Sequence, residues 1–284
     1  MIDDFDELED LLQSKEVFES ASKLKLDWPF SERLRDSLGE ARHILNQLPL
    51  EFMAGRRVLE VGAGLGIVSA YLEKKEIKIE AVEPAASIFG DNWKLLPLVR
   101  QTLEAKFPIH TCSVENLSAE KNGSYDVIFS HNVVEHMMNL EKSFLAMRRL
   151  LAPNGFMVHS CANYHFPYEP HFGVWLVPFS PSLTRFFSSK VRKNPAIWGA
   201  LNFVTAAKIE KLARQIGCSA HFQKGLMYET LMRLEKDPAF AARQTGWPRR
   251  IYHWLKQTTL LECVRFFPAH LATPMTVYLE PISS

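Results

Sequence analysis

Short apolar runs alternate with longer amphipathic segments through the middle of the chain. The runs at residues 58–61, 77–82, 125–130 and 156–160 are rich in β-branched and aromatic residues and predict buried strands. A short strand is also expected near residues 109–111. The predicted helices lie at residues 67–73, at 85–107, broken or kinked near Pro97, and at 135–151. Strands and helices that alternate in this way predict a parallel, doubly wound α/β sheet.

Helices are predicted before this alternation begins. An acidic segment carries an apolar stripe of Leu8, Leu11 and Leu12. A second helix is expected to start at Ser31, as its N-cap, and to end near residue 48. We therefore expect residues 1–50 to form a helical extension that packs on the sheet edge. Covering a ligand pocket is the alternative role.

The pattern changes after residue 160. Residues 163–204 carry aromatics, prolines and histidines without a clear period, which is typical of a lid or a binding loop. The α/β pattern resumes with a helix at 205–216 and a strand at 220–224. A helical insertion is expected over 225–272, before a last strand at 275–279. Residues 51–284 are thus predicted to be one domain with two insertions.

Three glycines, Gly62, Gly64 and Gly66, follow the first predicted strand. Glycine permits a sharp turn and lets a ligand approach the backbone closely. A strand, a glycine turn and a helix start together predict a site for a nucleotide-like ligand. The third glycine comes one place earlier than in the dinucleotide fingerprint G-x-G-x-x-G.

Two carboxylates flank this turn. Glu60 lies two residues before the first glycine, where it would repel a pyrophosphate and attract a cationic amino group. Glu83 closes the next apolar run, at a separation that suits hydrogen bonds from ribose hydroxyls. The early third glycine and Glu60 disfavour an NAD-dependent oxidoreductase, for which no hydride-transfer set is evident either.

Three segments resemble the class I S-adenosylmethionine-dependent methyltransferases, in the branch that includes ubiquinone-type O-methyltransferases. They are V-L-E-V-G-A-G-L-G at 58–66, A-V-E-P at 81–84 and Y-D-V-I-F-S-H-N-V-V-E-H at 125–136. The resemblance covers about residues 58–160. It implies a Rossmann-like seven-stranded sheet, mostly parallel with the last strand antiparallel, and helices on both faces. It also implies S-adenosylmethionine as the cofactor and S-adenosylhomocysteine as the product.

The resemblance also implies which residues contact the cofactor. The methionine end would lie on the glycine turn and Glu60, the ribose on Glu83, and the sulfonium near Ser130 or His131. The family usually holds the adenine with an acidic residue, but here the aligned position is Ser113, with Glu115 two places later. The cofactor residues are predicted to be Glu60, Gly62, Ala63, Gly64, Gly66, Glu83, Pro84, Ser113, Val114, Glu115, Ser130 and His131.

A hydroxyl acceptor must also lose its proton, and histidine is the usual base at neutral pH. His131 follows the strand at 125–130 and is expected to face the cofactor crevice. Glu135 and His136 begin the next predicted helix, where a structural role is expected.

A second group consists of His165, Tyr168, Glu169 and His171. Two histidines beside a carboxylate could orient one imidazole as a base. One alternative is that they bind a divalent metal that holds a sugar diol. The other is that these side chains only hold a proline-rich loop in place. We expect a base and no metal, with His131, His165, Glu169 and His171 as the catalytic candidates. Phe172, Trp175, Phe179 and Trp198 could form a sugar-stacking wall or simply core.

Composition excludes some partners and compartments. The 284 residues carry 33 Lys+Arg and 32 Asp+Glu, so no global field attracts nucleic acid. The motif after residue 129 also differs from the N-P-P-Y of base methylation. Four scattered cysteines form no C-x-x-C pair, and no targeting segment is evident, so a cytoplasmic location is expected. The basic, aromatic residues 248–267 are expected to form a packed helix, with contact to an anionic membrane as the alternative.

The acceptor is predicted from one further resemblance. The segment N-Y-H-F-P-Y-E-P-H-F at 163–172 is similar to methyltransferases of bacterial surface-polysaccharide and small-molecule pathways. We therefore expect O-methylation of a sugar or lipid-linked glycan. A quinone-like or other small hydrophobic acceptor is the second hypothesis, and a non-catalytic cofactor-binding module is the third.

Overall fold

The computed structural model describes residues 2–84, 90–178, 180–237, 240–241, 244 and 246–282, and the side chains from residue 4 onward. The chain forms two compact units. Unit 1 comprises Met1–Ser130 and Leu145–Met157, and unit 2 comprises His131–Phe144 and Val158–Ser284. The predicted domain boundary at residue 50 stays a prediction.

The main sheet has seven strands in the order β3-β2-β1-β4-β5-β9-β8. Strand β1 is parallel to β2 and β4, β2 is parallel to β3, and β8 is antiparallel to β9. This mixed sheet confirms the predicted methyltransferase-like fold class. The strands are β1 (Arg57–Val61), β2 (Lys78–Val82), β3 (Ile109–His110), β4 (Tyr125–His131), β5 (Leu151–Cys161), β8 (Cys218–Phe222) and β9 (Met275–Pro281).

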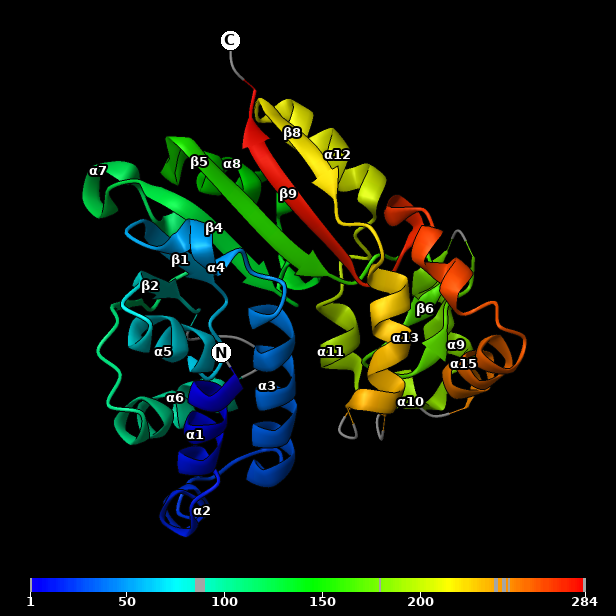
Figure 1. Ribbon diagram of the computed structural model, residues 1–284, viewed down its shortest axis with the longest axis horizontal. Helices are drawn as coiled ribbons and strands as arrows, with labels where there is room; N and C mark the ends of the chain where they lie inside the picture. Colours follow the sequence, from blue (N-terminus) through cyan, green and yellow to red (C-terminus); the bar gives the residue numbers. More distant parts are fainter. Residues whose placement is uncertain are drawn as a thin grey trace. The chain divides into compact units, whose positions relative to one another are not determined.

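Helices of unit 1 pack around β1–β3. The core there includes the buried side chains of Leu12, Leu34, Leu72 and Leu95. At the surface, Arg42 pairs with both Asp6 and Glu9 and ties the first helix to the third. The helices are α1 (Ile2–Leu12), α2 (Lys15–Ser22), α3 (Phe30–Leu45), α4 (Leu50–Met53), α5 (Ile67–Lys74), α6 (Asp91–Thr102) and α7 (Ala119–Asn122) (Figure 1).

Two details of the predicted helices in unit 1 were wrong. Helix α3 begins at Phe30 rather than at Ser31, and Pro29 stands at its N-cap. Helix α6 ends at Thr102 rather than near residue 107, and it is not broken at Pro97. Buried residues on both sides of that proline hold the helix against the core and offset the lost hydrogen bond. The helix start predicted at residues 85–89 lies outside the described residues.

Unit 2 contains the remaining helices and the small antiparallel hairpin of β6 and β7. Helix α12 lies along β8 (Figure 1). Thr205 caps α12, because its side chain accepts from the Lys208 amide. The elements are α9 (Thr184–Phe187), α10 (Ser189–Lys193), α11 (Pro195–Gly199), α12 (Ala206–Gln215), α13 (Leu226–Lys236), α15 (Trp247–Gln257), β6 (Tyr168–Glu169) and β7 (Val174–Trp175).

The helix predicted from residue 135 starts later. Val134–His136 form one 3-10 turn, and α8 runs over Leu140–Leu150. Asn139 starts α8, since its side chain accepts from the Lys142 amide at 3.0 Å. This shift separates Glu135 and His136 from the helix and places them on a turn.

The segment at 163–204 has a small core of its own, although its sequence shows no period. Phe172 and Trp198 are buried there, with their ring centroids 5.7 Å apart. These two aromatics are therefore core, whereas Trp175 remains exposed. Phe179 lies outside the described residues, and the movement of this segment as a lid stays a prediction. Among the described residues, no helix is long and apolar enough to span a membrane.

Candidate functional site

The glycine turn joins β1 to α5 in unit 1. Gly62, Gly64 and Gly66 have φ angles of 79°, 56° and 76°, a region that side chains other than glycine rarely adopt. A Cβ atom on Gly66 would lie 2.8 Å from Leu96 Cδ1 and 3.0 Å from Phe107 Cζ. At Gly64 the nearest atom would be Asn92 Nδ2 at 3.7 Å. Gly66 is thus required by packing, whereas Gly64 leaves room beside the backbone for a ligand.

Glu60 precedes the turn in β1, and Glu83 makes a hydrogen bond to it. Glu60 accepts a hydrogen bond from the Ser69 hydroxyl, and burial raises the pKa of its carboxyl to about 8. Glu83 accepts from the Gly64 amide at 3.1 Å, and burial raises its pKa to about 7. Two buried carboxyls with raised pKa values beside a glycine turn suit a ligand with a cationic group and hydroxyls.

The other predicted cofactor residues lie at the same ends of the parallel strands. Strand β4 pairs with β1 up to Glu60↔Phe129, so the buried Ser130 comes directly after the last pair. The Glu83 amide donates to the His110 carbonyl at the end of β3. Ser113 stands at the N-cap of the 3-10 turn Val114–Asn116 that follows β3. The roles assigned to these residues, to Ala63 and to Pro84 stay predictions.

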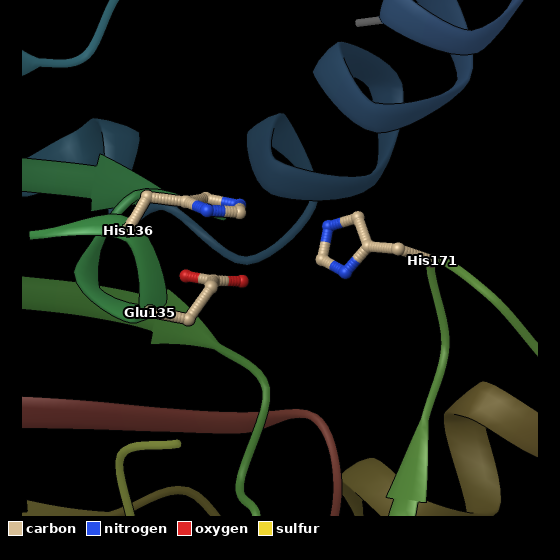
Figure 2. A group of neighbouring side chains, drawn as sticks. All are labelled: Glu135, His136 and His171. Atoms are coloured by element: carbon tan, nitrogen blue, oxygen red, sulfur yellow. The ribbon is translucent and has the colours of Figure 1, made fainter. Parts of the chain in front are cut away.

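A group of four residues in unit 2, Glu135, His136, Glu169 and His171, forms what we call the imidazole–carboxylate cluster. Figure 2 shows Glu135 and His136 on one turn, with His171 facing them from a different segment. Ligand-type atoms of Glu135, His136 and His171 all lie within 4.8 Å of one another. The two imidazole rings form an edge-on pair with centroids 5.3 Å apart.

Glu169 orients His171. Its carboxylate contacts His171 Nδ1 at 2.5 Å and also accepts from the Phe172 amide at 2.7 Å. The Tyr164 hydroxyl donates to the same carboxylate at 3.3 Å. Since Glu169 is fully buried and held by several donors, it fixes both the position and the tautomer of the His171 ring.

Glu135 and His136 are held by the backbone of their turn. Asn202 donates to the carbonyls of Val134 and Met137 at 2.7 and 2.9 Å, and its own amide donates to the Glu135 carbonyl. Burial raises the pKa of Glu135, whose side chain is 1% exposed. Burial lowers the pKa of His136 to about 4, so this imidazole is neutral at pH 7.

The structure brings together only some of the predicted catalytic residues. Glu169 and His171 meet as predicted, whereas His165 is exposed and lies outside the cluster. His131 ends β4, next to Asn132, whose backbone has a φ of 53°. Sequence reasoning gave Glu135 and His136 a structural role. Their approach to His171, which follows His136 by 35 positions, depends on the folding of a segment without periodicity, and the sequence carries no local signal for it.

Known proteins share sequence with most of this chain. A family model described as a methyltransferase domain matches residues 31–221, more than half of the chain. An uncharacterized protein of Mycobacterium tuberculosis is 28% identical over 250 residues, which cover 85% of this chain and 82% of that protein. The ubiquinone biosynthesis O-methyltransferase of Xanthomonas oryzae pv. oryzae is 29% identical over 127 residues, covering 43% of this chain and 52% of that enzyme.

Solved structures share the fold at low identity. An S-adenosylmethionine-dependent methyltransferase from Mesorhizobium loti has a TM-score of 0.53 at 13% identity and covers 86% of this chain and 98% of its own. Phosphoethanolamine N-methyltransferase 2 of Haemonchus contortus has a TM-score of 0.52 at 15% identity, and the match covers 98% of this chain and 60% of that enzyme. The sheet order, the glycine turn and the family match lead to one conclusion. This chain belongs to the methyltransferase-domain family and is an S-adenosylmethionine-dependent methyltransferase.

Proposed function

We propose that this enzyme transfers the methyl group of S-adenosylmethionine to a hydroxyl oxygen of a sugar or a lipid-linked glycan. The observation that carries the proposal is the imidazole–carboxylate cluster of unit 2. An alcohol holds its proton tightly at neutral pH, so its oxygen becomes a good nucleophile only if the protein assists the loss of that proton. A buried set of two imidazoles and two carboxylates is suited to this task.

The predicted cofactor residues lie in unit 1, except His131, which belongs to unit 2. Bound S-adenosylmethionine supplies a methyl group activated by its positive sulfonium. Glu60 would accept hydrogen bonds from the amino group, and Glu83 from the ribose hydroxyls. The positive φ values of the glycine turn keep the backbone open to the ligand. Most of the protein's contribution to methyl transfer is the placement of the acceptor in line with the methyl carbon.

Exposed aromatics in unit 2 support a sugar as the acceptor. Trp175 is 44% exposed on β7, and the rings of Phe166 and Tyr168 lie 5.9 and 5.6 Å from it. Such a ring assembly presents an apolar edge on which a sugar face can stack.

A lipid-linked glycan is favoured by helix α15. Trp247 and Trp254 are exposed on it, together with the cations Arg249 and Arg250. Exposed aromatics beside cations are typical of contact with an anionic membrane surface. The helix also packs on the protein through the buried Tyr252, and this packing leaves the two exposed tryptophans available for the membrane.

A quinone-like acceptor is the second candidate. The ubiquinone biosynthesis O-methyltransferases resemble this chain, and their name supports oxygen as the atom that is methylated. Their match spans about half of their own length and 43% of this chain, so their acceptor remains a proposal for this chain.

The proposal is tested with methyl-labelled S-adenosylmethionine and a panel of acceptors. The panel contains sugar diols, lipid-linked glycans, a catechol and a primary amine, and products are identified by NMR. We expect the label on a sugar oxygen. Label on the catechol alone would favour the second candidate, and label on the amine alone would overturn O-methylation. Cofactor binding without turnover on any acceptor would favour a non-catalytic module.

A further inference from the structure

We propose that Glu135, His136 and His171 bind a divalent transition-metal ion. The three residues offer one carboxylate oxygen and two imidazole nitrogens, all within 4.8 Å of one another. Two imidazoles and a carboxylate are a ligand set that suits Zn²⁺, Mn²⁺ or Fe²⁺ better than Mg²⁺ or Ca²⁺. The rings and the carboxylate face one common space (Figure 2).

The ligand distances are compatible with a bound ion. Metal–ligand bonds of about 2.0–2.2 Å place neighbouring ligand atoms roughly 3–4 Å apart. The cluster is therefore slightly wider than a loaded site. Small rotations of the His171 ring, at the partly exposed edge of the cluster, would close the difference.

Glu135 supplies an independent argument for a ligand. Its side chain is 1% exposed, and the Ala162 amide contacts Oε1 at 3.5 Å. The second oxygen, Oε2, is buried and has no hydrogen-bond partner among the residues that the structure describes. Burying an oxygen of this kind without a partner is costly. A bound cation would satisfy it.

Both imidazoles also have the outer contacts that metal ligands use. A ligating histidine commonly gives its other ring nitrogen to a carboxylate or a backbone carbonyl. His171 Nδ1 contacts the Glu169 carboxylate at 2.5 Å, which is the outer contact of this kind. His136 makes a hydrogen bond with the backbone of Ala200. A pair of histidines that only packed against each other would need neither arrangement.

Three protein ligands leave positions open on the ion. Open positions on an ion suit an acceptor with two neighbouring oxygen atoms, such as a vicinal diol. A metal-bound hydroxyl loses its proton at a lower pH than a free one. This consequence rests on the proposed O-methylation, whereas metal binding by the three residues does not.

The experiment is a calorimetric titration of the full-length protein, treated with EDTA and dialysed, with Zn²⁺ and with Mn²⁺. We expect one equivalent to bind per chain. Glu135→Gln and His171→Ala should each weaken binding at least tenfold. Glu169→Gln removes the outer carboxylate and should weaken it by about 10–100-fold. His221→Ala, an exposed histidine on β8, is the matched control and should bind as the wild type does.

Two further readouts keep the outcome unambiguous. Co²⁺ should give visible absorption bands that are lost in Glu135→Gln. Every variant should keep the thermal shift produced by S-adenosylhomocysteine, which shows that it is folded. Equal metal binding by wild type, Glu135→Gln and His171→Ala would overturn the site.

The failure of each proposal has its own signature. Methyl transfer to hydroxyls that persists in EDTA, with no metal isotherm, would overturn the metal site and leave O-methylation standing. A metal isotherm without transfer to any hydroxyl would contradict O-methylation and leave the metal site standing.

Discussion

The two functional regions of this enzyme are built in opposite ways. The glycine turn of unit 1 comes from one continuous stretch, β1 to β2, in which backbone conformation and two carboxylates form the site. The cluster of unit 2 is assembled from residues 135–136, from 169–171 and from the supporting Asn202. The first region is fixed by local geometry. The second depends on long-range packing, and in the proposed function it assists the loss of the acceptor's proton.

A substitution at Gly66 should give the largest effect and tests whether local backbone geometry determines the glycine turn. In Gly66→Ala, the left-handed backbone and the close approach of Leu96 and Phe107 should together lower the free energy of unfolding by about 2–4 kcal/mol. Binding of S-adenosylhomocysteine should be lost with it. Thermal unfolding and calorimetry measure both effects.

Gly39→Ala is the matched control for this change. Gly39 lies inside α3, and nothing comes within 4 Å of a Cβ atom there. Alanine should therefore stabilise the protein by about 0.5–1 kcal/mol and leave cofactor binding unchanged. An unaltered cofactor isotherm in Gly66→Ala would contradict the role of the turn.

The substitution Glu169→Gln in unit 2 tests whether the cluster affects methyl transfer independently of cofactor binding. The amide cannot hold the His171 ring as the carboxylate does. Methyl transfer should fall by about 10–100-fold, because histidine orientation governs both proton removal and metal binding. Affinity for S-adenosylhomocysteine should not change. Equal losses in rate and in cofactor affinity would show that the two regions are not separate in function.

The pH dependence of cofactor binding gives a smaller effect. The pKa of Glu60 is raised to about 8, so below that pH a proton must leave before the carboxylate can bind a cationic amino group. Affinity for S-adenosylhomocysteine should therefore rise with pH, by close to tenfold per unit between pH 6 and 7. Calorimetry across this range measures the slope, and Glu60→Gln should reduce it to the part that Glu83 contributes.

Stability of the ligand-free protein should change with pH in the opposite direction. Because the folded pKa of Glu60 lies above its unfolded value, its contribution is complete below about pH 4.5 and is lost as pH rises through 8. A cofactor affinity that falls with rising pH would contradict the assignment of Glu60.

The smallest expected effect concerns α15. Trp254→Ala should weaken sedimentation with anionic lipid vesicles several-fold, because an exposed indole would be lost from the contact surface. Methyl transfer to a water-soluble sugar should not change. No sedimentation of the wild type would contradict the membrane contact.

The fold and the cofactor turn could be predicted from the sequence because their signals are local. Apolar runs gave the seven strands to within a few residues, and the glycines with Glu60 and Glu83 identified the turn. The start of α8 was missed because the capping by Asn139 outweighed the helical spacing that begins at Glu135. The meeting of Glu135 and His136 with His171 depends on packing of a segment without periodicity, and no local rule predicts it.

The most direct test of the account is a cofactor titration of the double variant Glu135→Gln/His171→Ala beside Glu60→Gln. We predict that the double variant binds S-adenosylhomocysteine like the wild type while its methyl transfer falls below about 1%, a loss of roughly 3 kcal/mol of transition-state stabilisation. Glu60→Gln should lose at least tenfold in cofactor affinity. A double variant that loses cofactor affinity as Glu60→Gln does, or that still transfers methyl groups at the wild-type rate, would contradict the division of roles between the two regions.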